Sequence, residues 1–179
     1  IQSATNRIQS ITEDILSLEA LSTDEDLEAT DLTLLIQSVI RELTIQGELD
    51  DKRLIFVTTK NVPDVAAIPG QIREVLHNLL TNAVKYTHSG GHIEIKTEVR
   101  QAEICVSISD DGYGIHSDEI DRLFEPFARI ITAETEHIEG SGLGLYLVKQ
   151  IIQRHNGEVF VDSILDEGSV FGFVLPIVD

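Results

Sequence analysis

EGSGLGLYLVK, residues Glu139 to Lys149, is the most informative stretch of the chain, because three glycines spaced two residues apart lead directly into an apolar, helix-like segment. Glycine lets backbone N–H groups come close to an anion, and a helix N-terminus adds partial positive charge. Gly140, Gly142 and Gly144 therefore predict a phosphate-binding loop at the start of a helix. The alternative interpretation of this stretch alone is a flexible loop that ends in a helix.

The residues around this loop exclude two common phosphate-binding motifs. A P-loop needs Gly-x4-Gly-Lys-Ser/Thr, and the sequence contains no such run. The dinucleotide-binding fingerprint needs a third glycine three residues after Gly142, where Leu145 stands. The loop therefore has to be interpreted together with the other motifs of the chain.

Composition restricts the class of protein. The chain has 179 residues, 42% of them hydrophobic, which is enough for one domain with a core and an additional segment. Lys and Arg number 13 against 31 Asp and Glu, a net charge of −18, which argues against nucleic acid or an anionic membrane as the main partner. The single cysteine, Cys105, allows no internal disulfide and fits a reducing, cytoplasmic setting. No apolar run approaches the roughly 20 residues of a membrane span, there is no signal peptide, and the first residue, Ile1, indicates a fragment of a longer chain.

Apolar residues near the N-terminus recur at alternating steps of three and four, the a/d spacing of a coiled coil or helical bundle. This segment spans about three heptads, so the helix needs a partner to be stable. The acidic stretch STDEDLEATD, Ser22 to Asp31, interrupts the pattern and is typical of a linker. The a/d residues are Ile1, Ala4, Ile8, Ile11, Ile15 and Leu18.

Helical spacing predicts two further helices, and a strand is expected between them from Arg53 to Thr59. The first helix should turn its apolar stripe toward a sheet, and the second runs from about Gln71 to Lys85. The two stripes are Leu32, Leu35, Ile36, Val39, Ile40 and Leu43, and then Ile72, Val75, Leu76, Leu79, Leu80 and Ala83.

The other face of the second helix is polar. Glu74, Asn78 and Asn82 lie four residues apart, hence stacked on one side, and Lys85 extends this stripe. Taken alone, two asparagines on a helix are an ordinary solvated face, and Glu74 is interpreted as structural.

In the second half of the chain, apolar and polar residues alternate with the period of two that is typical of strands. Residues 93–99 and 104–108 predict an antiparallel pair, and residues 159–176 predict a hairpin that turns near Asp166, Glu167 and Gly168. Ser117 is expected to cap a short helix that runs to Phe124, and the glycine-rich helix should end near residues 156–157. Because helices and strands segregate, we expect an α+β, two-layer sandwich with a mixed, largely antiparallel sheet and helices on one face.

Four motifs in this order resemble the catalytic ATP-binding domain of sensor histidine kinases, which has the Bergerat fold. REVLHNLLTNAVKYT is similar to that family's N box, DDGYGI to its G1 box, LFEPFAR to its F box and GSGLGL to its G2 box. The resemblance covers about Thr30 to Pro176. Residues Ile1 to Leu21 resemble the end of the second helix of the family's dimerisation and phosphoacceptor domain.

The resemblance implies a role for each matching residue. Asn82 would be the Mg²⁺ ligand, Asn78 would contact phosphate or a metal-bound water, and Lys85 would neutralise phosphate oxygens. Tyr86 would lie against the adenine. The implied nucleotide-binding residues are Asn78, Asn82, Lys85, Tyr86, Asp110, Gly112, Gly114, Ile115, Phe127, Gly140, Ser141, Gly142, Leu143 and Gly144, with Asn78, Lys85 and Arg129 in catalysis.

Asp110 ends an apolar strand, where a carboxylate can be held rigidly over a pocket. A carboxylate accepts a hydrogen bond from the exocyclic amine of adenine but faces the carbonyl of guanine with no proton between them, which rejects GTP. The alternative for this segment is an ordinary Asp-Gly turn, which Asp111 and Gly112 also satisfy. Tyr113 stands where the family often has proline, and little consequence is expected.

The loop from about Ala128 to Ser141 resembles the family's ATP lid. The lid sequence has no apolar periodicity, so we expect no regular apolar contacts to hold the lid against the rest of the domain. Phe124 and Phe127 are expected to anchor the start of the lid in the core. Arg129 is the candidate for a second cationic contact to phosphate.

One catalytic group of related ATPases is missing. Gyrase B and the mismatch-repair proteins carry a glutamate four residues before the metal-binding asparagine, where this chain has Asn78, an amide that cannot act as a base. None of the six histidines is followed by Asp or Glu, and none lies in the N-terminal helix. We therefore expect ATP to be held without rapid hydrolysis, for a phosphoacceptor histidine outside this chain.

The sequence thus predicts the end of a dimerisation helix (residues 1–21), a linker (22–30) and an ATP-binding catalytic domain (31–179) of a cytoplasmic histidine kinase in a two-component phosphorelay. The implied cofactors are ATP and Mg²⁺. The implied partners are the dimerisation domain of the same protein, which would make a homodimer, and a response regulator. The alternatives are a degenerate nucleotide sensor without catalysis and a serine kinase of the anti-sigma type, against which the N-terminal heptads count.

Overall fold

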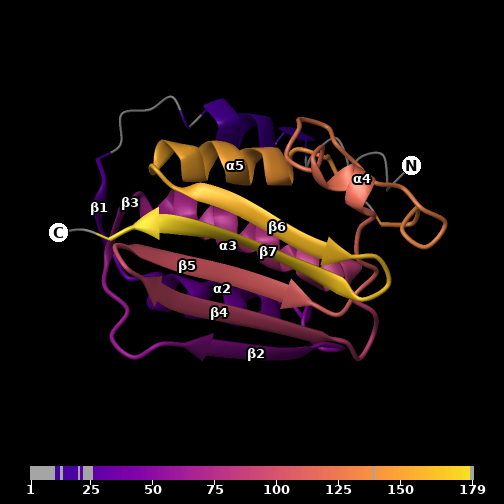
Figure 1. Cartoon of the computed structure of the whole chain (residues 1–179), viewed down its shortest axis with the longest axis horizontal. Helices are drawn as coiled ribbons and strands as arrows, with labels where there is room; N and C mark the ends of the chain where they lie inside the picture. Colours follow the sequence, from indigo (N-terminus) through magenta and orange to yellow (C-terminus); the bar gives the residue numbers. More distant parts are fainter. Residues whose placement is uncertain (1–10, 13, 20, 22–25, 139, 178–179) are drawn as a thin grey trace.

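The computed structural model describes residues 11–12, 14–19, 21, 26–138 and 140–177. A five-stranded sheet forms one layer and the long helices form the other, behind the sheet in Figure 1. The predicted α+β sandwich is therefore confirmed. The elements are β1 (Glu28–Thr30), α2 (Leu32–Ile45), β2 (Arg53–Thr58), β3 (Val65–Ala67), α3 (Pro69–Tyr86), β4 (His92–Arg100), β5 (Glu103–Asp110), α4 (Ser117–Ile120), α5 (Gly144–Arg154), β6 (Glu158–Ile164) and β7 (Gly168–Pro176).

The sheet is mixed and largely antiparallel, as expected. Its strand order is β2-β4-β5-β7-β6, and β2 runs parallel to β4 while every other neighbouring pair is antiparallel. The register aligns Ile95 with Ile108 and Ile108 with Phe171, so that apolar side chains form rows across the sheet. These rows face the helices and form the core.

Helix α3 lies in the middle of the helix layer and contacts both α2 and α5. Its apolar stripe is buried, with Ile72, Val75 and Leu76 fully inaccessible to solvent. Helix α2 also buries its stripe, at Leu32, Ile36, Val39 and Leu43. The polar face of α3 is therefore directed away from the sheet, where it is free to line a site.

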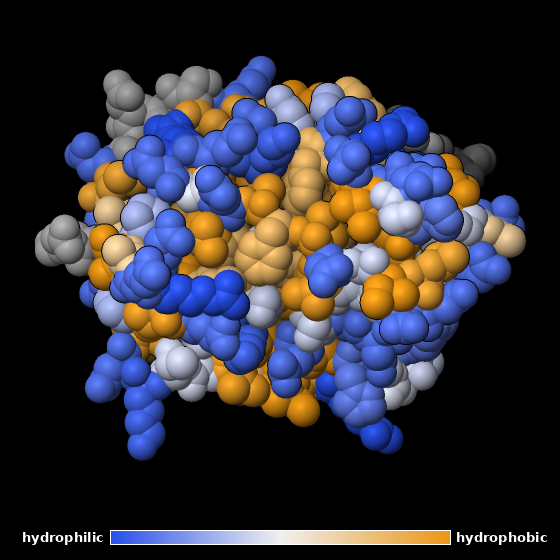
Figure 2. All heavy atoms as spheres, in the orientation of Figure 1, coloured by the Kyte–Doolittle hydropathy of each residue, from blue (hydrophilic) through white to orange (hydrophobic). Residues whose placement is uncertain are grey.

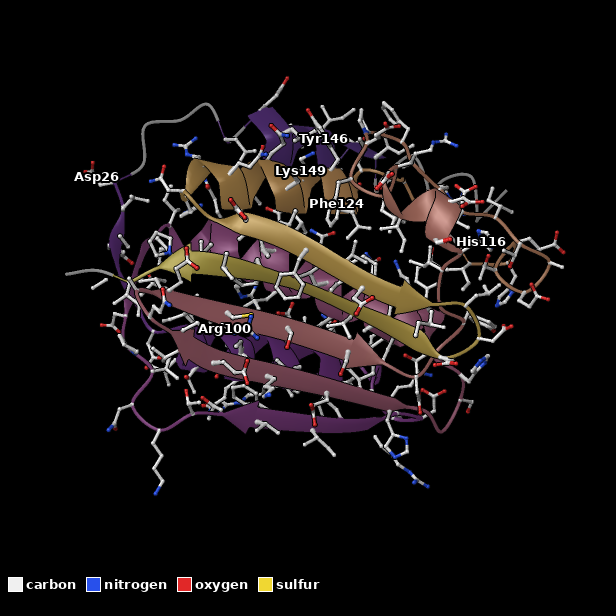
Figure 3. All side chains as sticks on the ribbon, viewed as in Figure 1. Asp26, Arg100, His116, Phe124, Tyr146 and Lys149 are labelled. Carbon is white, nitrogen blue, oxygen red and sulfur yellow. The ribbon has the colours of Figure 1, made fainter. Side chains whose placement is uncertain are left out.

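Among the described residues, no helix lies on the outer face of the sheet. Figure 2 shows this side, on which apolar and charged side chains are interspersed. Along β4, Glu98 bonds to Lys96 Nζ (2.6 Å) and to Arg100 Nη2 (2.7 Å), and Figure 3 shows Arg100 on this face. These pairs hold three long side chains over the strand.

Two short segments differ from the sequence-based expectation. Residues 28–30, assigned to the linker, form β1, because they pair with β3 and Thr30 Oγ1 donates a hydrogen bond to Ala67 O (3.3 Å). Helix α4 covers only residues 117–120, and turns continue the chain to Phe124. Its N-cap is His116, whose Nδ1 accepts from the Asp118 N–H (3.4 Å), so the predicted Ser117 cap was wrong by one residue.

The N-terminal segment is helical at residues 11–12 and 14–19. Leu18 and Leu21 pack against the domain core, whereas Ile15 is 44% exposed. The seam residues Ile1, Ala4 and Ile8 lie outside the described residues. Within the described part of the chain, no helix combines the length and hydrophobicity needed to traverse a bilayer.

A buried histidine ties the end of α5 to the beginning of α3. His155 is 1% exposed, its Nδ1–H donates to Ile151 O (2.7 Å), and its Nε2 accepts from the Ile68 N–H (3.0 Å). Ile68 is the N-cap of α3 and supplies no side-chain hydrogen bond. His155 therefore satisfies a backbone donor that the α3 N-terminus leaves open.

We expect His155→Ala to lower the free energy of unfolding by about 2 kcal/mol at pH 7.5, because it leaves the buried Ile68 N–H without an acceptor. Burial lowers the pKa of His155 below its ordinary value. The stability that neutral His155 contributes is thus present above about pH 6.5 and is lost as the pH falls through the folded-state pKa. Urea unfolding at pH 7.5 and pH 5 should show a smaller cost at pH 5; an unchanged cost would contradict this account, and exposed His137→Ala is the control.

Candidate functional site

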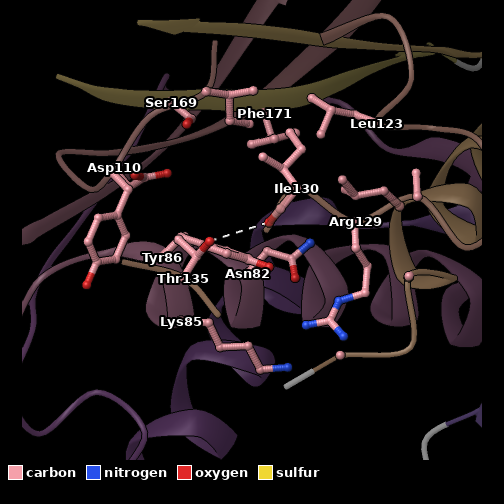
Figure 4. A pocket seen from close by; sticks show the side chains of 18 of the residues that line it. Asn82, Lys85, Tyr86, Asp110, Leu123, Arg129, Ile130, Thr135, Ser169 and Phe171 are labelled. Atoms are coloured by element: carbon pink, nitrogen blue, oxygen red, sulfur yellow. Dashed lines mark hydrogen bonds between the residues drawn. The ribbon is translucent and has the colours of Figure 1, made fainter. Parts of the chain in front are cut away.

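A cavity of about 200 Å³ lies between the polar face of α3, the end of β5, the lid loop and the start of α5. Figure 4 shows it from close by. Most residues that the sequence analysis selected line it: Asn78, Asn82, Lys85, Tyr86, Asp110, Gly114, Ile115, Arg129, Gly140, Ser141, Gly142 and Gly144. Segments far apart in the sequence therefore meet at one place.

Three selected residues do not line the cavity. Gly112 and Leu143 are buried beside it and act through their backbone: the Gly112 N–H donates to Asp110 Oδ1 (2.9 Å) and the Leu143 N–H to Ser141 Oγ (3.1 Å). Phe127 is 62% exposed, so the expectation that it anchors the lid in the core was wrong. Its backbone, at φ 62°, lies against Gly142, which directs the ring outward.

The first polar group of the cavity is Asn78 on α3. Its Nδ2 donates to Glu74 O, one turn earlier (3.1 Å), which leaves Oδ1 directed to the start of α5. A Cβ at Gly144 would lie 2.6 Å from this oxygen. Glycine at 144 therefore allows α5 to begin directly beside the amide.

Asp110 forms the opposite end of the cavity. It ends β5, faces Ser169 on β7, and accepts hydrogen bonds from the backbones of Gly112 and Ser169. Burial nevertheless raises its pKa to about 6, because desolvation outweighs these bonds and the neighbouring Asp111 also disfavours a second negative charge. A partly buried carboxylate of this kind gains most from a ligand that donates a hydrogen bond to it.

Two cations lie at the other end. In Figure 4, Lys85 and Arg129 extend toward the same region of the cavity, away from Asp110. Burial raises the pKa of Tyr86, and the charge of Arg129 opposes this increase, which places the guanidinium within electrostatic reach of the tyrosine hydroxyl. The cavity therefore has an anionic end and a cationic end, as an elongated ligand with a donor group and a phosphate chain requires.

The lid is more ordered than its sequence suggests. Arg129 Nη2 donates to Ile138 O (2.7 Å), and Ile138 is buried. Thr135 is also buried; its Oγ1 accepts from the Thr132 N–H (3.0 Å) and donates to Ile130 O (3.4 Å), the dashed line in Figure 4. Hydrogen bonds rather than apolar periodicity thus fold the lid over the cavity.

Sequence reasoning missed several lining residues. Thr135 and Ile130 come from the lid. The lid contains a turn that cannot be predicted from the sequence, because it has no apolar periodicity. Ser169 and Phe171 belong to β7, where alternation identifies a strand but not what its side chains face. The other missed residues are Asp14, Thr81, Ala83, Leu123, Ala128, Thr132, Glu134, Leu145, Leu165 and Asp166, together with Tyr113.

Asp14, from the N-terminal helical segment, lines the cationic end of the cavity. It also lines a neighbouring polar cleft of about 450 Å³, together with α2 and α3 residues such as Glu42 and Glu74. The cleft adjoins the cationic end, because the two spaces share four lining residues, Asp14, Asn78, Thr81 and Lys85.

We expect Asp14→Asn to strengthen the binding of Mg-ADP about 2- to 5-fold at low salt, because it removes a carboxylate that repels the phosphates. Titration calorimetry at two ionic strengths measures the effect, which should shrink at the higher one. Glu19→Gln is the matched control, since Glu19 lies in the same helical segment but lines neither space. Equal effects of both substitutions would mean that Asp14 acts only through net charge.

Comparison with known proteins identifies relatives of this arrangement. A family model described as histidine kinase-, DNA gyrase B- and HSP90-like ATPase matches residues 67–179. The sensor histidine kinase WalK of Bacillus subtilis is 35% identical over 123 residues, 65% of this chain and 20% of WalK. The adaptive-response sensory kinase SasA of a Synechococcus species is 36% identical over 149 residues, 83% of this chain and 39% of SasA. The chain thus spans between a fifth and two fifths of these relatives.

The fold is shared with solved structures. The histidine kinase ThkA, in complex with the response regulator protein TrrA, superposes with a TM-score of 0.79 at 25% identity, covering 99% of this chain and 49% of that one.

Proposed function

Because the chain belongs to the family of histidine kinase-, DNA gyrase B- and HSP90-like ATPases, we propose that it is the ATP-binding catalytic domain of a sensor histidine kinase. It would position Mg-ATP for transfer of the γ-phosphoryl group to a histidine on a separate dimerisation and phosphoacceptor domain. The observation that carries the proposal is the polarity of the cavity, with Asp110 at one end and Asn78, Asn82, Lys85 and Arg129 at the other.

The anionic end suits adenine. Ionised Asp110 can accept a hydrogen bond from the adenine amine, because the backbone N–H groups of Gly112 and Ser169 occupy only two of its roughly four lone-pair sites. Guanine would place a carbonyl against this carboxylate and leave two acceptors facing each other in a buried site. The domain is therefore expected to select adenine over guanine nucleotides.

The cationic end suits a triphosphate with Mg²⁺. Where α3 lines the cavity it offers two amide side chains, Asn78 and Asn82, whereas its carboxylate Glu74 lines only the neighbouring cleft; this set fits a metal that keeps several waters and takes its other oxygens from phosphate. Asn82 would supply the protein ligand and Asn78 would hold a water or a phosphate oxygen. When bound, Mg²⁺ neutralises charge that develops on the phosphates. Lys85 and Arg129 would bind phosphate oxygens, and Arg129 would have to exchange its bond to Ile138 O for this role.

Catalysis by this site would consist of positioning and charge neutralisation. Asn78 is an amide, hydrogen-bonded to Glu74 O, and cannot take a proton from water. ATP bound here should consequently be hydrolysed slowly and wait for an incoming imidazole. Such a group would arrive from the side of the polar cleft that Asn78 and Lys85 line.

The proposed function also implies an organisation of the chain into segments. Residues 1–21 would end a dimerisation helix, 22–30 would form the linker with β1 at its end, and 31–179 would form the catalytic domain. The full protein would act in the cytoplasm as a homodimer. A response regulator would then receive the phosphoryl group, in line with the ThkA–TrrA complex.

Phosphotransfer in trans tests the proposal. The chain is mixed with a separate phosphoacceptor domain and γ-labelled Mg-ATP, with Asn82→Ala as the inactive control. Label on the acceptor that is stable in alkali and lost in acid would support histidine phosphorylation. Acid-stable label would instead indicate a serine kinase, and the absence of label by a chain that binds ATP would indicate a non-catalytic nucleotide sensor.

A further inference from the structure

Tyr113 lies in the cavity wall three residues after Asp110, between two glycines that carry no side chain. We propose that its ring stacks on the nucleotide base and so determines how tightly the base is held. The inference rests on the proposed function, since it concerns the same adenine site. It replaces the sequence-based expectation that a tyrosine at this place has little consequence.

The backbone of Tyr113 is fixed on both sides. Its N–H donates to Tyr86 O at the end of α3 (3.1 Å), and its carbonyl accepts from the Asp166 N–H in the β6–β7 turn (2.8 Å). The flanking Gly112 and Gly114 pack so closely on Tyr86 and on Ile164 that a Cβ at either would overlap their backbones. Tyr113 therefore cannot drift away from the wall that contains Asp110.

The ring of Tyr113 is also fixed. It contacts the ring of His88 in an edge-to-face arrangement, with centroids 4.3 Å apart and planes at 67°. Pairs of this geometry are favourable beyond the area they bury, because the positive edge of one ring meets the negative face of the other. His88 follows α3 and lines neither the cavity nor the adjoining cleft, so it acts as a support behind the wall.

The residues at the Asp110 end of the cavity have different roles in binding, and these roles follow from their chemistry. Every base has a π-face, so stacking on an aromatic ring raises affinity without distinguishing bases. Asp110 accepts a hydrogen bond from the adenine amine and so distinguishes adenine from guanine. Tyr86, at the end of α3, also lines the cavity, and Tyr113 is the aromatic side chain that follows Asp110 in the same wall.

Calorimetric titration with Mg-ADP tests the proposal on three variants of residue 113 and one control. Tyr113→Ala and Tyr113→Leu should weaken binding about 5- to 50-fold, the range expected for loss of one stacked ring, whereas Tyr113→Phe should stay within about 2-fold of wild type. Leucine matters because it keeps apolar packing but removes the aromatic face. Tyr146→Ala, on α5 and outside the cavity lining, is the matched control (Figure 3).

His88→Ala tests whether the His88 ring supports the ring of Tyr113. It should weaken Mg-ADP binding about 2- to 4-fold in the wild-type background and have no effect in Tyr113→Ala, because the two rings act as one unit. Circular dichroism and urea unfolding establish that each variant is folded before its affinity is compared.

The outcomes separate this inference from the proposed function. Wild type that binds Mg-ADP while Tyr113→Ala or Tyr113→Leu binds it equally well would overturn the role of Tyr113 alone. Equal losses in Tyr113→Phe and Tyr113→Leu would also overturn it, since the hydroxyl and not the ring would then matter. Folded wild type that binds no adenine nucleotide would overturn both.

Discussion

Asp110→Asn should abolish adenine nucleotide binding and at the same time stabilise the nucleotide-free domain. The amide places an NH₂ group where the carboxylate accepts from the adenine amine, so two donors face each other in a buried site. We expect affinity for Mg-ADP to fall at least about 100-fold at pH 7.5, measured by calorimetry. The Gly112 N–H keeps its acceptor, because asparagine retains one oxygen.

The gain in stability follows from the pKa of the Asp110 carboxyl group. Burial raises the pKa of Asp110 to about 6, above its ordinary value, so the folded protein holds this proton more tightly than the unfolded chain does. The free energy of unfolding therefore decreases as the pH rises from about 4 to about 6, and ionised Asp110 destabilises the fold at pH 7.5. Asn cannot ionise, and we expect it to add about 1 to 3 kcal/mol at pH 7.5 and progressively less below pH 6.

Asp111→Asn is the control from the adjacent position. The Asp111 carboxylate accepts from the His92 N–H (2.7 Å), which lowers its pKa, and it does not line the cavity. This substitution should leave Mg-ADP affinity unchanged and reduce stability at neutral pH, the opposite sign. If Asp110→Asn binds Mg-ADP like wild type, Asp110 does not read the base. If it is less stable than wild type at pH 7.5, the account of its burial is wrong.

The second large effect is expected at Gly114. Its φ is 63°, and a Cβ there would overlap the carbonyl of Ile164 and lie 2.9 Å from Leu165 Cα. Because both obstacles are backbone atoms, no rotamer change relieves the overlap. Gly114→Ala should lower the free energy of unfolding by about 3 kcal/mol, or roughly 6 to 12 °C in Tm, and weaken Mg-ADP binding by displacing the wall that holds Asp110.

Gly70→Ala provides the comparison for the backbone argument. Gly70 lies in the first turn of α3 without a positive φ, and no neighbouring atom lies within 4 Å of the place that a Cβ would occupy. Alanine there should stabilise the domain by about 0.5 kcal/mol, because it reduces the freedom of the unfolded chain. A Gly114→Ala variant as stable as wild type in thermal unfolding would show that the β6–β7 turn adapts freely, which contradicts the close packing described here.

The elements with strong periodicity could be predicted from the sequence. The buried stripe of α3 and the alternation in β4 and β5 each reflect one face against one core, so spacing alone identified them. The polar stripe of Asn78 and Asn82 followed from the same helical geometry. It became informative because Asp110 and the glycine-rich loop stood in a fixed order around it.

The remaining features depend on contacts between segments distant in sequence. β1 was assigned to a linker because three residues of an acidic stretch show no pattern until β3 pairs with them. Phe127 is typical of a core residue in sequence, yet its backbone conformation turns the ring outward. The contribution of Tyr113 depends on the ring of His88, 25 positions earlier, which no spacing rule connects with it.

The most direct test of the central claim is calorimetric titration of the chain with ADP and with GDP, each with and without Mg²⁺, on wild type and Asn82→Ala. The account predicts that wild type binds ADP and not GDP, that Mg²⁺ strengthens ADP binding, and that Asn82→Ala loses this dependence on Mg²⁺. Equal binding of ADP and GDP, or no binding of either by folded protein, would contradict the claim that this cavity is an adenine nucleotide site.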